Sequence, residues 1–437
     1  MTKSTEHEND IDLDETAATP MSAVSPRPSA ASLIDWEPAV AEQASAQVRL
    51  KPRKSRPFFG RHPWVLDSAI ASVAGEPADG DAVDLLSDTG KFIARGVFNS
   101  RSRIRVRLYS WQPEPLDDSF WRARLETALA LRERLGYTDP EGGARLVFSE
   151  ADGLSGLIVD RYADYLAVQV TSLAMRARLP RLVPLLVDLL HPRGIYLRTE
   201  KGIGQAEGLE LLDGLAWGRD PGGPIFVTEH GLRYGVDLAV GQKTGFYLDQ
   251  RENRRALAAY TAGARLLDMF CYSGGFSLTA RRWGRASDVV AVDASPRAIA
   301  LARANAQLNG ESGIRFVERD GFEALDELVI AREKFGAVVL DPPKFARNRG
   351  SLDDALRAYH RLNRQAVNLL EPGGILLTCS CSGAVSREDF LYMLVGVAQQ
   401  TGRDIQILEQ RGAAPDHPVS ATCLETEYLK CFICRVL

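Results

Sequence analysis

Apolar and polar positions alternate with different periods in successive parts of this chain of 437 residues. From residue 48 to about residue 110 the pattern is β-like, with short runs of β-branched and aromatic residues. Three short runs rich in β-branched and aromatic residues lie between Gly-containing turns, at 82–86, 92–98 and 104–109. This pattern predicts a small β-barrel over residues 48–115. Residues 1–47 lack such a pattern, are rich in Ser, Ala and acids, and are predicted to be a disordered acidic tail.

Helical and strand periods are mixed in the next part of the chain, residues 116–224. Apolar residues at helical spacing predict a helix over 117–135, and a second helix is predicted over 174–190, where it ends at a His-Pro pair. Strands are predicted over 145–159, 165–171 and 195–198. The sequence therefore predicts a central α+β domain.

Strands and helices alternate over residues 225–437, after a hairpin at 226–238 and a helix at about 249–260. Five apolar strands are predicted over 265–270, 289–292, 314–317, 337–340 and 374–379, and a reversed terminal pair near 404–409 and 428–435. Such alternation predicts a Rossmann-like α/β domain with a mostly parallel seven-stranded sheet and helices on both faces.

Acidic residues follow three of these predicted strands in succession: Asp268, Asp293 and Asp320. In open α/β sheets, ligands bind outside the carboxyl ends of the strands, where glycines let the backbone approach the ligand. Each acid alone is better explained by a helix cap or a turn, but three at successive strand ends predict a cofactor that contains adenosine. The loop after the first strand supplies further candidates for holding it: Phe270, Tyr272, Ser273, Gly274 and Gly275.

The fourth and fifth strands end in residues that favour methyl transfer from S-adenosylmethionine. Asp341 is followed by two prolines, which make a stiff loop able to hold its carboxylate over a methyl group. Lys344 stands where an aromatic side chain would indicate methylation of an exocyclic amine. Cys381 follows the fifth strand, and a thiolate that adds to C6 of a cytosine makes C5 nucleophilic. A cysteine is often just a small buried apolar residue, and this alternative stays open for Cys379 and Cys381.

The cysteines and the charge distribution indicate the compartment and the kinds of site to expect. Six cysteines without paired spacing predict no disulfide framework and a reducing cytoplasm. Cys431 and Cys434 would point to opposite faces of a strand, and no histidine has metal-ligand spacing, so no metal site is predicted. No apolar run is long enough for a membrane span. The net charge is −4, but residues 1–47 carry −7, so the rest of the chain is positive.

Basic residues gather in the predicted barrel. Some alternate with aromatic residues near its start, which gives Lys51, Arg53, Lys54, Arg61, His62 and Trp64 as candidates for RNA contact. Others recur at period two and are predicted to share one strand face: Arg101, Arg103, Arg105 and Arg107. A one-sided basic strand beside aromatics is typical of RNA binding, and Lys344 is a further candidate. The alternative is an exposed strand that uses charge to prevent edge pairing.

Short motifs spread along the chain match a known family. They are Arg61-His62-Pro63-Trp64-Val65, Asp152-Gly153-Leu154 with Asp160-Arg161, the run from Gly241 to Arg251, Asp341-Pro342-Pro343-Lys344-Phe345, Ser380-Cys381-Ser382-Gly383, Asp416-His417-Pro418-Val419 and Tyr428-Leu429-Lys430. In these motifs the sequence resembles the bacterial ribosomal RNA large-subunit cytosine-5 methyltransferases that carry an N-terminal PUA domain. The resemblance covers residues 48–437, and residues 1–47 have no counterpart in it.

The resemblance implies a PUA barrel, a central α+β domain and a class I methyltransferase domain, with RNA bound across their shared cleft. It implies Cys381 as the nucleophile. It assigns the methionine end of S-adenosylmethionine to the Asp268 loop and to a second segment with Gln242, Lys243, Thr244, Gly245, Asp249 and Arg251. Two features depart from the family pattern. Cys379 stands where an aromatic residue is expected, and Lys344 occupies the region where other RNA cytosine methyltransferases carry a second cysteine, so the group that removes the C5 proton stays open.

The predicted function is 5-methylation of a cytosine in large-subunit (23S) ribosomal RNA, with S-adenosylmethionine as methyl donor, in the cytoplasm. Two alternatives stay open: a guanine methyltransferase of ribosomal RNA, which needs no thiol, and an inactive RNA-binding factor of ribosome assembly. A dehydrogenase fits the fold alone but gives Cys381 no role. The target nucleotide, free RNA or a subunit as substrate, and the oligomeric state, with a homodimer among the options, also stay open.

Overall fold

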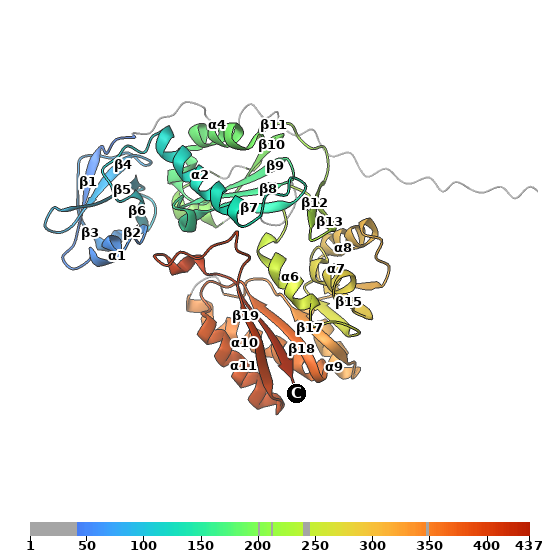
Figure 1. Cartoon of the computed structure of the whole chain (residues 1–437). Coiled ribbons are helices and arrows are strands. Elements are labelled where there is room, and N and C mark those ends of the chain that lie inside the picture. The colour runs from blue at the N-terminus through green and yellow to red at the C-terminus, as the bar shows by residue number, and fades with distance from the viewer. Residues whose placement is uncertain (1–41, 200–201, 211–212, 239–244, 347–348) are drawn as a thin grey trace, which may run out of the picture.

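The computed structural model describes residues 42–437 except 200–201, 211–212, 239–244 and 347–348, and residues 1–41 lie outside the described part. Three units follow one another along the chain, each with a sheet of its own (Figure 1). We call them the N-terminal domain (46–110), the central domain (118–218) and the C-terminal domain (225–437). No helix of the described part is long and apolar enough to cross a membrane.

A six-stranded sheet with the order β2-β6-β5-β4-β1-β3 forms the N-terminal domain. Three strands match the predicted ones: β4 (Ala82–Leu86), β5 (Phe92–Phe98) and β6 (Ile104–Ser110). The sequence did not predict β1 (Ala46–Leu50), β2 (Trp64–Leu66), β3 (Ile70–Ala74) and the short helix α1 (Arg56–Phe59). β2 is only three residues long and β3 is exposed at four of five positions, so neither has an apolar period. β1 begins two residues inside the predicted tail, because its alternate side chains are buried in the core.

The central domain has a five-stranded sheet with the order β11-β10-β9-β8-β7. The strand predicted over 145–159, with the turn-prone Asp152-Gly153 inside it, is two strands in the structure, because a 3-10 turn (Ser149–Asp152) and Gly153, with a φ of 70°, reverse the chain there. The helix predicted over 174–190 is also wrong in its length, because it is interrupted near Arg178. The elements are α2 (Asp118–Arg134), β7 (Gly143–Phe148), β8 (Leu157–Tyr162), β9 (Tyr165–Val170), α3 (Leu173–Arg176), α4 (Leu179–Leu190), β10 (Gly194–Arg198), and the unpredicted α5 (Ile203–Glu207) and β11 (Gly214–Gly218).

The C-terminal domain opens with the predicted hairpin, β12 (Ile225–Glu229) and β13 (Leu232–Val236), and then builds a seven-stranded sheet. Its elements are α6 (Arg251–Ala258), β14 (Arg265–Met269), α7 (Gly275–Arg282), β15 (Asp288–Asp293), α8 (Pro296–Leu308), β16 (Ile314–Glu318), α9 (Gly321–Ile330), β17 (Phe335–Leu340), α10 (Leu352–Leu369), β18 (Leu370–Ser380), α11 (Arg387–Thr401), β19 (Ile405–Arg411) and β20 (Lys430–Val436). The last two strands are antiparallel to each other and stand in exchanged order at the sheet edge, with β20 between β18 and β19, which confirms the predicted reversed terminal pair.

In the strand order β16-β15-β14-β17-β18-β20-β19, the chain moves outward from β14 to β16 on one side and then continues from β17 on the other side of β14. At such a switch point the loops after the two strands diverge and leave room for a ligand. The parallel register sets Met269 beside both Val292 and Leu340, and Leu340 beside Thr378. The loops after β14, β15, β17 and β18 therefore emerge at one edge of the sheet.

Hydrogen bonds from two ion-paired arginines join the central domain to the segment between β19 and β20, which reaches toward the two other domains (Figure 1). Arg132 pairs with Asp152 at 2.7 Å and donates to the Asp416 carbonyl at 2.8 Å. Arg145 pairs with Asp160 at 2.7 Å, and its backbone N–H donates to the Asp416 carboxylate at 3.0 Å. Burial acts against ionisation, but His417 and Arg251 still hold the pKa of Asp416 at about 2. This network explains two of the sequence motifs by packing rather than by catalysis.

Candidate active site

The loop after β14 has a backbone that few sequences tolerate. Phe270, Tyr272 and Gly274 all have positive φ, at 63°, 46° and 76°. A Cβ on Gly275 would lie 2.8 Å from the Arg254 side chain, so only glycine fits at the start of α7. This explains the Gly-Gly pair, and it turns the first backbone N–H groups of α7 toward the edge of the sheet where the strand-end loops meet.

Asp268 fixes this loop from below. It is 1% exposed, and its Oδ2 accepts hydrogen bonds from the N–H of Ser277 at 3.0 Å and from its hydroxyl at 2.6 Å. Its Oδ1 has no hydrogen-bond partner within the described residues. Burial raises the pKa of this carboxyl to about 7, although the Ser277 contacts lower it. A buried carboxylate oxygen without a partner is costly, and a cationic ligand group would relieve that cost.

Asp293 lies at the neighbouring strand end, half-buried. Its Oδ2 accepts from the Tyr272 N–H at 3.0 Å, and its Oδ1 accepts from the Ser295 N–H at 2.9 Å. The Ser273 carbonyl accepts from Asn305 at 3.0 Å. Asp293 thus binds the β14 loop directly, and each carboxylate oxygen keeps acceptor capacity for a hydroxyl group.

Asp320 has a different role in the structure from the first two acids. It is the exposed N-cap of α9 and accepts from the N–H groups of Phe322 at 2.9 Å and Glu323 at 3.2 Å. Gly321 follows it, and a Cβ there would lie 2.5 Å from the Phe270 ring. The contacts of Asp320 are therefore those of a helix cap, and the Phe270 ring packs beside it.

The second predicted cofactor segment lies partly outside the described residues, which do not include Gln242, Lys243 and Thr244. Of its other members, Gly245 accepts a hydrogen bond at its carbonyl from the Tyr272 hydroxyl at 3.1 Å, so it adjoins the β14 loop. Asp249 instead accepts from the Tyr428 hydroxyl at 2.6 Å. Arg251 pairs with Glu229 at 3.6 Å and Asp416 at 3.5 Å. Arg251 also reaches the Gly143 carbonyl of the central domain, whereas the contact of Asp249 with Tyr428 stays within the C-terminal domain.

Cys379 and Cys381 have opposite environments. Cys379 is 0% exposed, lies within β18 opposite Cys431 and accepts from the Gln250 amide at 3.4 Å. Burial raises the pKa of its thiol well above the usual value. Cys381 follows the end of β18, is half-exposed, and its Sγ lies 4.0 Å from the Pro342 carbonyl. Only Cys381 therefore combines access with a place beside the loop of Asp341.

Two serines fix the position of Cys381. Ser380 and Ser382 are both 0% exposed, and both hydroxyls bond the Tyr359 hydroxyl, at 3.0 Å and 3.1 Å. The Ser382 hydroxyl also accepts from the Ala346 N–H at 3.2 Å, which ties it to the loop after β17. With both neighbours turned inward, the residue between them is left at the surface. The Ser-Cys-Ser motif thus has a structural cause that its spacing alone does not reveal.

Tyr247 and Lys430 join this group, although neither was a predicted site residue. The Tyr247 ring lies edge-on to Tyr272, with ring centroids 5.1 Å apart. Burial raises the pKa of its hydroxyl well above the ordinary range, and the charges of Asp341 and Cys381 add to the rise. Tyr247 therefore connects the β14 loop with the Asp341 and Cys381 loops. Both residues stand inside family motifs, which was the one signal available for them.

The predicted RNA-binding residues divide into two groups. Lys51, Arg53, Lys54, Arg61 and Arg103 are exposed on the N-terminal domain, as is Lys344 beside the active site. Arg105 is half-buried and donates to the Asn99 carbonyl at 3.1 Å. The remaining candidates contact other domains.

The prediction that Arg107 lies on the RNA face is wrong. Its side chain is buried and pairs with Glu150 at 3.3 Å and Glu207 at 2.8 Å, both in the central domain. β6 begins only at Ile104, so Arg101 and Arg103 also lie outside the strand whose face they were predicted to share. Trp64 is half-buried and donates its indole N–H to Glu150 at 3.0 Å. A period of two predicts a shared face but not what covers that face.

His62 lies against the C-terminal domain, where its Nε2 is 3.6 Å from Glu425. Cys423 lies beside them, and the three possible ligand atoms lie within 4.8 Å of one another. The backbone N–H of Trp64, however, donates to His62 Nδ1 at 3.3 Å. This bond favours the tautomer with a proton on Nε2, the atom that a metal would need. The arrangement is better suited to an interdomain polar contact than to a metal ion.

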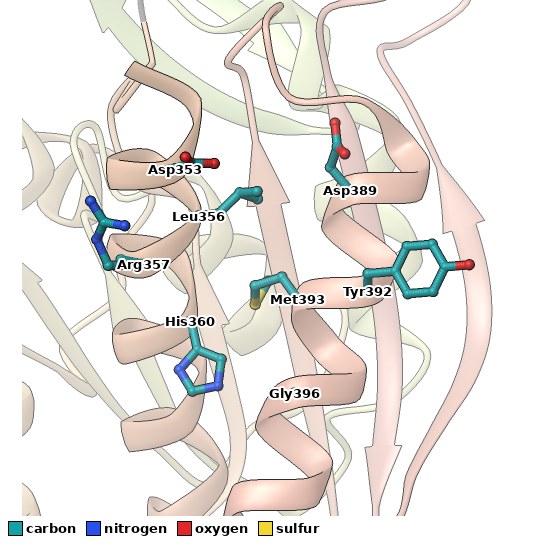
Figure 2. Close-up of a pocket in the computed structure, with 8 residues that line it drawn as sticks. All are labelled: Asp353, Leu356, Arg357, His360, Asp389, Tyr392, Met393 and Gly396. Carbon is teal, nitrogen blue, oxygen red and sulfur yellow. The ribbon is translucent and has the colours of Figure 1, made fainter. Parts of the chain in front are cut away.

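A shallow hollow lies elsewhere, between α10 and α11 (Figure 2). Its lining residues are Asp353, Leu356, Arg357, His360, Asp389, Tyr392, Met393 and Gly396. None of the strand-end residues described above contributes to it, so the chemistry of the strand ends is separate from this hollow.

Comparisons with known proteins agree with this geometry. A family model described as an S-adenosylmethionine-dependent methyltransferase matches residues 217–426, and one described as a PUA-like domain matches residues 48–111. Ribosomal RNA large subunit methyltransferase I of Aeromonas hydrophila is 40% identical over 395 residues, which cover 90% of this chain and 99% of that protein. The protein of the same name from Escherichia coli O139:H28 is 38% identical over 396 residues, covering 90% and 100%. The chain belongs to this family.

The methyltransferase also shares its fold with solved structures. A protein described as a methyltransferase in complex with SAH has a TM-score of 0.78 and 20% identity, over 89% of this chain and 99% of that one. A structure from Streptococcus mutans described as an S-adenosylmethionine-dependent methyltransferase scores 0.77 at 18% identity. The predictions of an α/β methyltransferase fold with a PUA-like domain, and of S-adenosylmethionine as cofactor, are confirmed.

Proposed function

We propose that the methyltransferase forms 5-methylcytosine in large-subunit ribosomal RNA, with Cys381 as the nucleophile. The observation that carries this proposal is the half-exposed Cys381 thiol beside the Pro342 carbonyl, at the same edge of the sheet as the β14 loop. The relatives at 38–40% identity are named for large-subunit ribosomal RNA. A guanine methyltransferase would not need a thiol at this point.

The residues around the β14 loop suit S-adenosylmethionine, which supplies an electrophilic methyl group on a sulfonium when bound. The buried, unpartnered Oδ1 of Asp268 suits a cationic amino group, and the two carboxylate oxygens of Asp293 suit ribose hydroxyls. The other residues proposed to hold the cofactor border them: Gly245, Phe270, Tyr272, Ser273, Gly274, Gly275, Asp320 and Asp341.

The protein's own part in the reaction follows from Cys381. Its thiolate adds to C6 of the cytosine and forms an S–C bond, which makes C5 nucleophilic toward the methyl group. Asp341 and Pro342 hold the base side of the pocket, since the double proline fixes their backbone. Loss of the C5 proton then restores the C5–C6 double bond and releases the thiolate.

The exposed cations of the N-terminal domain are proposed to contact RNA phosphates. They are Lys51, Arg53, Lys54, Arg61 and Arg103. Lys344 extends this set toward the reacting base. None of the cysteines in the described part forms a disulfide, which suits a reducing cytoplasm.

The test uses RNA that carries 5-fluorocytosine at the target. Thiolate addition and methyl transfer do not require loss of a C5 proton, but release does, and fluorine cannot leave as a cation. A covalent complex is therefore expected to accumulate with wild type and with Cys379→Ala, and to be absent with Cys381→Ala. If no complex forms although the natural RNA is methylated, the thiol mechanism is wrong and the guanine alternative gains.

A further inference from the structure

Lys430 is a buried cation next to the proposed nucleophile. It is the first residue of β20, and its partner across the antiparallel ladder is Ser380, the residue before Cys381. It is 2% exposed. Its Nζ donates to the Ser382 carbonyl at 2.7 Å and to the Tyr428 carbonyl at 2.9 Å. The amine therefore holds the turn that presents Cys381.

Two carbonyl oxygens do not neutralise a buried ammonium group, which also requires a negative charge nearby. Among the groups that act on Lys430, Glu427 is paired with Arg387 at 2.7 Å, and Asp389 accepts from the Ser386 backbone at 2.9 Å in the cap of α11. The remaining group that can become anionic is the Cys381 thiol, which stands between Ser380, the ladder partner of Lys430, and Ser382, whose carbonyl binds the Lys430 amine. Burial lowers the pKa of Lys430 to about 8, and the charge of Cys381 is the strongest influence that opposes this lowering.

We propose that Lys430 is a positioning residue for methyl transfer, which fixes the turn at Ser382 and serves as the counter-charge of the Cys381 thiolate. This inference rests on the proposed function. When the thiol ionises, the S–H bond breaks and its electron pair stays on sulfur. The proton passes to Lys430 where the amine is neutral, or to water where it is already an ammonium group. In either case a thiolate and an ammonium group face each other before RNA binds.

The experiment measures alkylation of Cys381 by iodoacetamide from pH 5.5 to 9.5, in the full chain without RNA. Mass spectrometry locates the label, and the fully buried Cys379 on the same tryptic peptide is the internal reference. Because only the thiolate reacts, the rate reports the apparent pKa of Cys381. Lys430→Gln keeps amide donors for the carbonyls but removes the charge. It is expected to raise that apparent pKa by about one unit and to slow alkylation at pH 7 about tenfold.

Two further variants separate charge from structure. Lys430→Arg keeps the charge and should leave the alkylation profile close to that of wild type. Lys334→Gln removes an exposed cation that donates to the Asn368 carbonyl at 2.7 Å, at the opposite end of β17 from Asp341, and it should also leave the profile unchanged. An unchanged profile in Lys430→Gln would overturn the proposal. If that variant does not fold, wild type alone decides, because an apparent pKa at or above that of an ordinary thiol, about 8.5, contradicts a thiolate paired with Lys430.

Failure of this inference and failure of the proposed function have different signatures. A shifted profile in Lys430→Gln without any 5-fluorocytosine adduct would leave the ion pair in place and remove the cytosine mechanism. A normal 5-fluorocytosine adduct with an unchanged alkylation profile in Lys430→Gln would support the cytosine mechanism and overturn the ion pair. In methylation assays Lys430→Gln should lower kcat and leave KM for S-adenosylmethionine near the wild-type value, because Lys430 acts through Cys381.

Discussion

Arginine and lysine are used in opposite ways at the domain contacts and on the outer face of the N-terminal domain. Arg107 and Arg132 are buried, the Arg145 side chain is only 12% exposed, and each pairs with a carboxylate of the central domain. Lys51 and Lys54, by contrast, are exposed. The three arginines are paired with carboxylates that the fold supplies, whereas the two exposed lysines are accessible to a phosphate from outside. Burial therefore separates the cations that the fold itself pairs from those accessible to a ligand, and neither residue type nor spacing does.

The largest loss of stability is expected when Arg145 is replaced. Its partner Asp160 is 0% exposed, so Arg145→Met leaves a buried carboxylate without its cation. Loss of one partner of a buried pair costs about 3–5 kcal/mol, and the first urea transition should shift accordingly. The matched change Arg319→Met removes a cation that pairs with Glu327 on the surface, and its transition should coincide with that of wild type. Equal shifts in the two variants would contradict the distinction.

The sequence predicted much of the C-terminal domain because its strands are continuous apolar runs with acids at their ends, so β14, β15, β16 and β17 appear within a few residues of their predicted positions. It failed where tertiary contacts decide. The short strand β3 has no apolar period. Arg107 has the spacing of a surface strand, but the carboxylates that bury it lie over 40 residues away. Tyr359, which orients Cys381, lies on α10, and no local pattern connects the two residues.

Asp268 differs from the buried arginines, because one of its carboxylate oxygens has no hydrogen-bond partner within the described residues, and we propose a ligand as that partner. Its folded pKa is raised to about 7, so the folded state binds a proton that the unfolded state releases above pH 4. Stability should therefore fall as pH rises from about 4 to 7, by at most roughly 4 kcal/mol. Asp268→Asn should flatten this decline, as measured by urea unfolding at several pH values.

The control for this effect is Asp320→Asn, which changes an exposed helix cap at the end of the neighbouring loop. This variant should keep the wild-type dependence on pH. A decline that persists in Asp268→Asn would mean that another group titrates, and it would leave the unpartnered oxygen without the role proposed for it.

Asp293 tests the same edge of the sheet through binding. Loss of charge-assisted hydrogen bonds to ribose hydroxyls is worth roughly 1.5–3 kcal/mol, so Asp293→Ala should weaken S-adenosylmethionine binding by about 10- to 100-fold in calorimetry. RNA affinity should change little. The matched control is Asp288→Ala at the opposite, exposed end of β15, which should leave both affinities unchanged. Unchanged cofactor affinity in Asp293→Ala would exclude this residue from the site.

The smallest effect is expected at the exposed cations, and it appears as salt dependence rather than as lost stability. Each phosphate contact to single-stranded RNA contributes about 0.7 to the slope of log affinity against log salt. Replacing Lys51, Arg53 and Lys54 by Gln should reduce that slope by about 2 and leave thermal unfolding unchanged. Arg107→Met should leave the slope unchanged but lower the unfolding temperature, because its guanidinium pairs with Glu150 and Glu207. Fluorescence anisotropy with a large-subunit RNA fragment, between 50 and 300 mM salt, measures the slope. If both variants reduced it equally, the buried arginine would also contact RNA, and burial would not separate the two uses of charge.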